Sequence, residues 1–247
     1  MRALVIAVAL ALAPLAHAAD APCAEETFDG SRFTVCPVDT ARHTIDIVWA
    51  DKGGMPYRAF HVYAENNDIT GVRFAMNAGM FHLDGSPVGL LKVDGRQVER
   101  LQTADGPGNF HMKPNGVFFV AKGKVGIETS DDFAARKSVD AATQSGPMLL
   151  IKGALHPAFQ NDGPSRLIRN GVGVRGSTKA FFAISEDPVS FGKFARLFRD
   201  RLDCSDALYF DGTVSSLWVP RQSREDKSVP FGPMIVVRDK PAPAKQQ

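Results

Sequence analysis

Residues 116–128 read GVFFVAKGKVGIE, which is two short apolar runs joined at Lys122-Gly123. Runs of this length around a glycine-containing turn are typical of antiparallel β-hairpins. The pattern recurs at 90–101, LLKVDGRQVERL, where Asp94-Gly95 is a favoured two-residue hairpin turn. Hairpins are therefore expected to dominate the middle of the chain.

Other short apolar runs bounded by turn residues predict further strands. They cover 44–49, 72–76, 148–151, 171–175, 180–185, 207–210 and 234–237. Strand pairs of this kind favour an α+β fold over alternating parallel β-α-β units. We expect one domain with a largely antiparallel or mixed β-sheet built from hairpins and a few packed helices, although the length also allows two small domains.

One amphipathic helix is predicted over 188–202, where Phe191, Phe194 and Phe198 lie on one stripe. Pro188 suits the first turn of this helix, and Asp187 suits its cap. A second helix is expected around 56–65. The aromatic stripe is interpreted as core packing.

The composition is that of an ordinary globular protein. Of 247 residues, 44% are hydrophobic and 23% are charged, and the formal net charge is +2. A nearly neutral chain carries no bulk attraction to nucleic acid, so nucleic acid is excluded as a partner class.

The N-terminus has the features of a cleavable secretory signal peptide over 1–18. Arg2 precedes an apolar run from Ala3 to Leu15, and Ala16-His17-Ala18 is a small-residue cleavage site. The run is short for a membrane span, so an uncleaved anchor is the weaker alternative. We expect a domain over 19–239, a flexible tail over 240–247, no membrane span, and a periplasmic or secreted location.

The three cysteines are Cys23, Cys36 and Cys204. Disulfides are expected in an exported protein. A Cys23–Cys36 bond would close a short loop and leave Cys204 free. Connectivity does not follow from the sequence, and Cys204 stays an alternative partner for either of the other two.

Two short motif matches are rejected. Residues 171–176, GVGVRG, fit the dinucleotide fingerprint, but the following residues read as a strand where that fingerprint requires a helix. Ser190 and Lys193 fit the S-x-x-K pattern of penicillin-binding enzymes, but the companion motifs are missing.

Clusters of glycine and polar residues stand at the predicted strand ends. Glycine lets a backbone approach a ligand, while Asn, Gln, Ser and Arg supply directed hydrogen bonds. One such cluster is usually a turn, but five in one chain predict a single polar site. The clusters are NAGMF (77–81), GNFHMKPNG (108–116), TQSGP (143–147), RNGVG (169–173) and DGTVSS (211–216).

The chain resembles the bacterial exported branch of the phosphodiester glycosidase family, whose domain is shared with the mannose 6-phosphate uncovering enzyme. The resemblance extends over about 33–237. It rests on the runs NAGMF (77–81), PVGL (87–90), KPNG (113–116), ATQSGPM (142–148), RNGVGV (169–174) and ALYFDG (207–212).

The resemblance implies an enzyme that hydrolyses the bond at the anomeric carbon of a sugar joined to phosphate in a diester. Asn77 matches the Asn of the family's N-x-G-F-like run, and Arg169 matches the Arg before its glycine-containing strand. Residues 211–216 match its D-G-G-G-S-S run, except that Thr213-Val214 replaces two glycines.

A phosphomonoester is a good leaving group, because its second pKa is roughly 6. One carboxylate with cationic help is therefore enough for the chemistry. The candidate catalytic residues are Asp211, which positions water or stabilises the oxocarbenium-like centre, Arg169, which holds the phosphate, and His111, a proton carrier. The candidate substrate-binding residues are Asn77, Gly79, Asn115, Gln144, Ser145, Gly146, Asn170, Gly212, Ser215 and Ser216.

No cofactor is expected. A divalent cation such as calcium is an option for the phosphate, with Asp84 or Asp211 as an oxygen ligand, although no ligand spacing indicates a metal site. The alternative function is a non-catalytic envelope-glycan binding module of the same fold. A structural or interaction protein is a third reading, and it predicts an exposed apolar patch. Sugar, aglycone and oligomeric state stay open.

Overall fold

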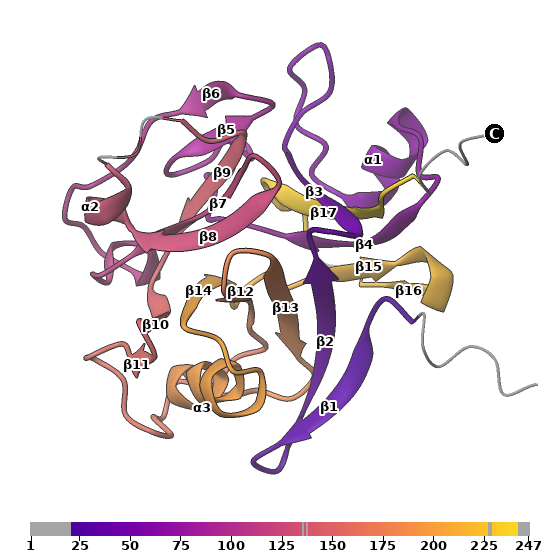
Figure 1. Cartoon of the computed structure of the whole chain (residues 1–247). Helices are drawn as coiled ribbons and strands as arrows, with labels where there is room; N and C mark the ends of the chain where they lie inside the picture. Colours follow the sequence, from indigo (N-terminus) through magenta and orange to yellow (C-terminus); the bar gives the residue numbers. More distant parts are fainter. Residues whose placement is uncertain (1–20, 135, 137, 227–228, 242–247) are drawn as a thin grey trace, which may run out of the picture.

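The computed structural model describes residues 21–134, 136, 138–226 and 229–241. The predicted signal peptide over 1–18 lies outside the described residues, as does most of the predicted tail. The described chain forms three β-sheets with short helices at their margins (Figure 1). Every pairing between its named strands is antiparallel, which confirms the predicted α+β class with hairpin-built sheets.

The three sheets collect strands from distant parts of the sequence. In sheet order, the first has seven strands: β1 (Ala24–Phe28), β2 (Ser31–Asp39), β13 (Lys179–Ser185), β12 (Asn170–Arg175), β14 (Asp206–Asp211), β10 (Met148–Ile151) and β11 (Ala154–Leu155). The second has five: β16 (Arg224–Glu225), β15 (Leu217–Val219), β4 (Val72–Asn77), β17 (Met234–Asp239) and β3 (His43–Val48). The third also has five: β6 (Arg96–Glu99), β5 (Leu91–Val93), β9 (Ala141–Ser145), β7 (Gly116–Ala121) and β8 (Lys124–Thr129).

The hairpin predicted over residues 116–128 is present as β7–β8, with Ala121 opposite Lys124. Its turn residues Lys122 and Gly123 have φ of 51° and 71°. Positive φ at both central residues is what a type I′ turn requires, and this turn matches the twist of the strands it joins. Asp94 and Gly95, in the turn of the β5–β6 hairpin, also have positive φ, at 47° and 75°.

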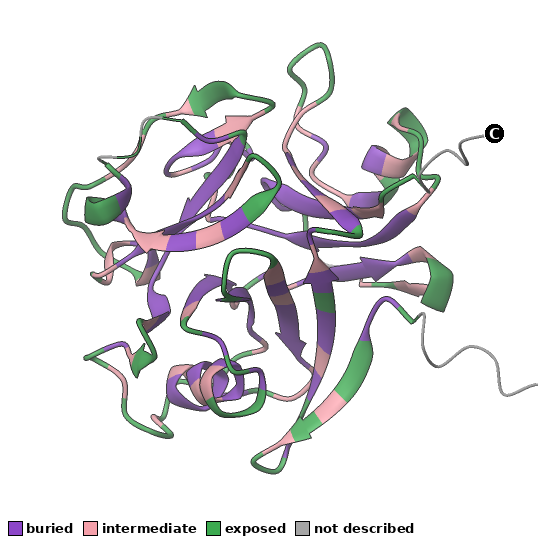
Figure 2. Cartoon of the chain, in the orientation of Figure 1, coloured by how far each residue is buried: buried purple, intermediate pink, exposed green. Residues whose placement is uncertain are grey.

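The sheets share one core. Phe182 of β13 contacts Phe74 of β4 and Phe118 of β7, with ring centroids 5.5 and 5.7 Å apart. One phenyl ring therefore comes from each sheet, and a continuous buried cluster surrounds them. Figure 2 shows this buried interior against exposed turns and loops. A single domain, as predicted, is the result.

The predicted helix over 188–202 begins later than expected. It starts at Phe191, as α3 (Phe191–Arg196), and continues as a π-helical turn over Leu197–Arg201. Ser190 is the cap, because its hydroxyl accepts the Lys193 N–H at 3.1 Å. Asp187 instead accepts the Arg32 N–H at 2.8 Å, and Val189 exchanges two backbone hydrogen bonds with Leu167. Phe194 and Phe198 of the aromatic stripe are buried in the core, as predicted, and Phe191 is partly buried against it.

The remaining helices are short. The helix expected around 56–65 is α1 (Phe60–Asn66), because Pro56 and Tyr57 still pair with the segment after β3. The helix α2 (Ser130–Phe133) and 3-10 turns over Asn109–His111 and Pro220–Gln222 complete the described helical elements. Among the described residues, no helix is long and apolar enough to cross a membrane.

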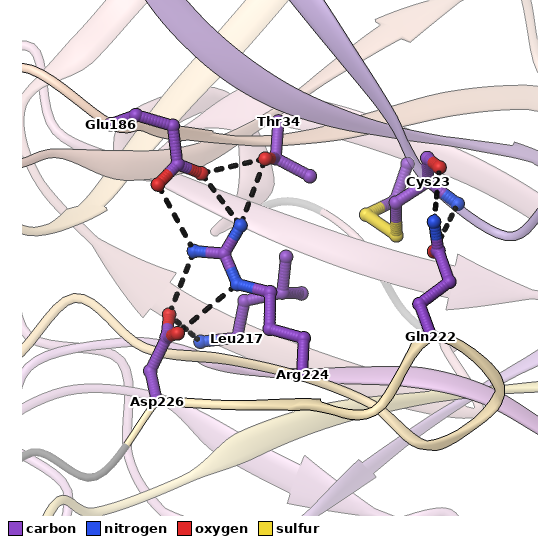
Figure 3. The surroundings of a disulfide bond; sticks show 8 residues. Cys23, Thr34, Glu186, Leu217, Gln222, Arg224 and Asp226 are labelled. Carbon is purple, nitrogen blue, oxygen red and sulfur yellow. Dashed lines mark hydrogen bonds and ion pairs between the residues drawn. A yellow bond between two sulfur atoms is a disulfide. The ribbon is translucent and has the colours of Figure 1, made fainter.

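The Cys23–Cys36 disulfide is present, and Cys204 is a buried free thiol, as one of the open pairings predicted. The Gln222 side chain bonds both the N–H and the carbonyl of Cys23, at 3.2 and 3.0 Å. Beside it, Arg224 donates to Glu186 at 2.6 Å and to Asp226 at 2.9 Å (Figure 3). These contacts fasten the β15–β16 hairpin to the first sheet.

We predict that Arg224→Ala lowers the free energy of unfolding by about 1–3 kcal/mol, since it leaves the partly buried carboxylates of Glu186 and Asp226 without their cation. The neighbouring pair of Arg221 with Asp239 is more exposed, at 42% and 33%, and Arg221→Ala should cost less than about 1 kcal/mol. Urea unfolding measures both. Equal small losses would show that the Arg224 network does not fasten the hairpin.

Candidate active site

A cavity of about 310 Å³ opens where the end of β14 meets the turns from the other two sheets. Two of its residues, Tyr209 and Asp211, come from the last three residues of β14, where the pairing with β12 shifts register. The described lining consists of Met80, Phe81, Asn109, Tyr209, Asp211, Thr213 and Val214. Three of the predicted polar clusters thus contribute directly to one cavity.

Asp211 is held rigidly at the end of β14 and is 8% exposed. Its Oδ1 accepts the backbone N–H groups of Gly212 and Thr213 at 2.5 Å each, and that of Val214 at 3.1 Å. Within the described chain no hydrogen bond reaches Oδ2. The turn therefore fixes the carboxylate and leaves one oxygen for a ligand or a water molecule.

A buried polar cluster supports this turn. Asn77 Oδ1 accepts hydrogen bonds from Asn170 Nδ2 and from the Ser216 N–H, both at 2.8 Å. The Ser215 hydroxyl donates to the Ile168 carbonyl at 2.9 Å. Asn77 Nδ2 is buried and has no hydrogen-bond partner among the residues that the structure describes. Asn77, Asn170 and the serines therefore join three of the predicted clusters into one network.

Arg169 is fully buried behind the cavity wall. Its Nε donates to the Val189 carbonyl at 2.9 Å, and its Nη2 donates to the Ser165 carbonyl at 3.1 Å. The guanidinium carbon lies 3.7 Å from the ring centroid of Phe191 and 5.4 Å from that of Tyr209. Nη1 makes no hydrogen bond of good geometry within the described chain. Tyr209 lines the cavity and contacts Arg169, which does not itself line the cavity.

Tyr209 lines the cavity but is not among the residues predicted from the sequence. Burial raises the pKa of its hydroxyl, while the neighbouring Arg169 opposes that rise. Burial lowers the pKa of Arg169. A neutral phenol beside a cation is a good hydrogen-bond donor. A Cβ at Gly212 would lie 2.3 Å from the Tyr209 oxygen, so glycine is needed there to leave room for this hydroxyl.

His111 does not line the cavity. It ends the 3-10 turn over Asn109–His111, and its Nδ1 lies 3.0 Å from the Ala104 carbonyl oxygen. Asn109, at the start of the same turn, is the residue that reaches the cavity. Of the cluster 108–116, the structure therefore brings Asn109 to the cavity in place of His111.

The remaining predicted binding residues form the supporting shell. Gln144 Oε1 accepts the N–H groups of Leu90 and Gln102, and its Nε2 donates to Gln102 and Ser130, which uses its full hydrogen-bonding capacity. Asn115 Nδ2 donates to the Phe110 carbonyl, and the Ser145 hydroxyl donates to that of Phe210.

The predicted glycines Gly79 and Gly146 permit close backbone approach. A Cβ at Gly79 would lie 2.4 Å from the Gln144 carbonyl oxygen, and one at Gly146 would lie 2.6 Å from that of Phe110. Both contacts are far below a normal separation, so the turns that bear Met80 and Asn109 can pack on β9 only with glycine there. Three of the five predicted clusters therefore line the cavity, and the other two, 143–147 and 169–173, pack against the segments that bear its lining residues.

No group of three His, Cys, Asp or Glu side chains suited to a metal ion occurs in the described residues. Asp84 accepts hydrogen bonds from the Ser86 N–H and hydroxyl at 2.9 and 2.6 Å, and it does not line the cavity. Of the two acids considered for a cation, only Asp211 lies in the site.

Comparisons with known proteins show what this chain is similar to. A family model described as phosphodiester glycosidase matches residues 70–241, which contain every candidate site residue. The uncharacterized protein YigE of Escherichia coli (strain K12) is 35% identical over 238 residues, covering 95% of this chain and 92% of that protein.

Two solved structures share the fold at low sequence identity. The zebrafish N-acetylglucosamine-1-phosphodiester alpha-N-acetylglucosaminidase catalytic domain, auto-inhibited by its pro-peptide, is 15% identical with a TM-score of 0.59, covering 88% of this chain and 82% of that one. A hypothetical protein from Synechocystis is 14% identical with a TM-score of 0.53, and the match covers 88% of this chain and 61% of that one. At such identities the likeness concerns the fold alone.

Proposed function

This chain belongs to the phosphodiester glycosidase family, and from that premise we propose that it is an exported hydrolase that cleaves the glycosidic bond of a sugar-1-phosphodiester or a related envelope glycan. The observation that carries the proposal is the cavity in which Asp211 is fixed by three backbone N–H groups while Tyr209, backed by Arg169, faces the same space.

The reaction breaks the bond between the anomeric carbon and the phosphate oxygen. The electron pair of that bond leaves with the phosphomonoester, and water supplies a hydroxyl to the carbon and a proton to solvent. The carboxylate of Asp211 stabilises the positive charge that develops on the sugar or orients the attacking water.

The leaving phosphate gains negative charge as the bond breaks. In the proposal, the Tyr209 hydroxyl donates a hydrogen bond to it, and the buried cation of Arg169 strengthens that donor from behind. Arg169 therefore acts as a positioning residue through Tyr209. We assign no proton transfer to His111, because Asn109 is the residue of its turn that lines the cavity.

Export and location remain part of the proposal. A disulfide supports an oxidising compartment, because such bonds persist mainly in secreted and periplasmic proteins. The predicted signal peptide over 1–18 supports the same location. A periplasmic or secreted enzyme meets envelope glycans and phosphodiesters, and hydrolysis needs only water as the second reactant.

The test is to incubate the mature chain, residues 19–247, with a panel of sugar-1-phosphodiesters and to measure the free sugar and the phosphomonoester. We expect stoichiometric release of both products from at least one substrate. Saturable binding without product would favour the alternative, a glycan-binding module of the same fold. Neither binding nor product across the panel would contradict both functions.

A further inference from the structure

A second cavity, of about 530 Å³, lies away from the candidate active site and shares no lining residue with it. It is formed by the end of β3 and the loop that follows, by α1, and by the β5–β6 hairpin, which lie near one another in Figure 1. Its lining includes Trp49, Tyr57, Tyr63, Asn67, Arg96 and Gln97. The proposed hydrolysis makes no use of this cavity.

Three aromatic side chains line it: Trp49 is half-buried and offers most of the exposed ring surface, while Tyr57 and Tyr63, 8% and 3% exposed, support the wall from behind. Tyr57 and Tyr63 meet edge to face with ring centroids 5.3 Å apart. Asn67 Nδ2 donates to the Tyr57 hydroxyl at 3.1 Å, and Trp49 Nε1 donates to the Gly85 carbonyl at 2.7 Å. Since these polar tips are already engaged, the rings are fixed in place, and little side-chain freedom remains to be lost when a ligand binds.

The charged groups of this cavity balance. Asp51 and Asp94 are matched by Lys52 and Arg96, so the lining carries no formal net charge. The exposed Gln97 amide adds both donors and an acceptor. Such a lining suits a ligand that is uncharged, rich in hydroxyl groups and apolar on its ring faces, whereas an anion would require an excess of cations.

We propose that this second cavity binds a neutral oligosaccharide. Sugar rings present C–H groups that pack on aromatic side chains and hydroxyls that bond to amides and charged groups, which is the mixture found here. Trp49 also contacts the loop 80–88, whose stem residues Met80 and Phe81 line the first cavity. The two cavities therefore flank one loop.

The experiment measures binding of neutral tetrasaccharides of glucose, mannose and N-acetylglucosamine by titration calorimetry. It uses the full mature chain carrying Asp211→Asn, so that a bound glycan is not consumed. We expect saturable binding of at least one tetrasaccharide. Val98→Trp, which fills the second cavity, should weaken that binding at least about tenfold, or 1.4 kcal/mol.

The matched control is Ile69→Trp. Ile69 and Val98 are both β-branched and both 41% exposed, but Ile69 does not line the cavity. This control should bind like the parent. Binding unchanged by Val98→Trp, or no binding of any tetrasaccharide, would each overturn the proposal. Because the readout is binding, it is separate from any failure to observe phosphodiester hydrolysis.

Discussion

Asp211→Asn lowers kcat for sugar-1-phosphodiester hydrolysis by about 10²–10⁴-fold in our account, the range expected for a group that acts directly on the reacting atoms. Asparagine has nearly the same shape, and its Oδ1 can still accept the N–H groups of the turn that follows. It lacks the negative charge. The substitution therefore separates the charge of this residue from its structural role.

The control for this prediction lies on the same strand. Asp206 begins β14 at the end opposite Asp211, and its carboxylate accepts the Lys152 N–H at 2.9 Å. Asp206→Asn should keep kcat within about twofold, since it lies away from the cavity. Steady-state kinetics of the two variants, with matched thermal unfolding curves, make the comparison. Full activity in Asp211→Asn would remove Asp211 from the mechanism.

Tyr209→Phe is expected to lower kcat by about 10²–10³-fold, the usual loss when one donor to a developing negative charge is removed. The ring stays in its contact with Phe191, whose centroid is 4.8 Å away, so packing is retained. Only the hydroxyl is lost. Arg169→Met should reduce kcat in the same direction, because in our account Arg169 works through that hydroxyl.

The dependence on the leaving group tests this role. An aryl phosphate departs more readily than an alkyl phosphate and needs less help, so Tyr209→Phe should slow the alkyl substrate more than the aryl substrate. The losses from Tyr209→Phe and Arg169→Met should also be less than additive, since both remove one interaction. Equal losses for both substrates, or strictly additive losses, would count against a contact with the leaving phosphate.

The hairpins were predictable because their information is local. Lys122-Gly123 and Asp94-Gly95 carry the backbone angles of the turn in adjacent residues. The strand β9 was not predicted, because its sequence AATQS has no apolar alternation although all five residues are buried. Its burial is stabilised by tertiary partners such as those of Gln144, which come from several segments. Hydrogen bonds between such distant segments leave no local pattern in the sequence.

The same distinction applies to the site. The five polar clusters could be found because each is compact in the sequence, and their meeting follows from the strand ends that bear them. The role of each side chain could not be read in this way. Gln144 was predicted to bind substrate, but protein partners use all of its hydrogen-bonding groups. Tyr209 belongs to an apolar run predicted as a strand, yet its side chain lines the cavity.

The start of α3 is decided by tertiary contacts that compete with local capping preferences. Asp187 and Pro188 form a good helix start by local rules, but Arg32 and Leu167 occupy the backbone and side-chain partners that such a start would need. Ser190 then caps the helix three residues later. A tertiary contact therefore outweighs a local preference of about 1 kcal/mol.

The central claim is that this chain breaks a bond at the anomeric carbon, and hydrolysis in water enriched in oxygen-18 tests it most directly. The account predicts that the heavy oxygen appears at the anomeric carbon of the released sugar, with none in the phosphomonoester, by mass spectrometry of both products. Heavy oxygen in the phosphomonoester would mean cleavage of the phosphorus–oxygen bond and would contradict a glycosidase mechanism.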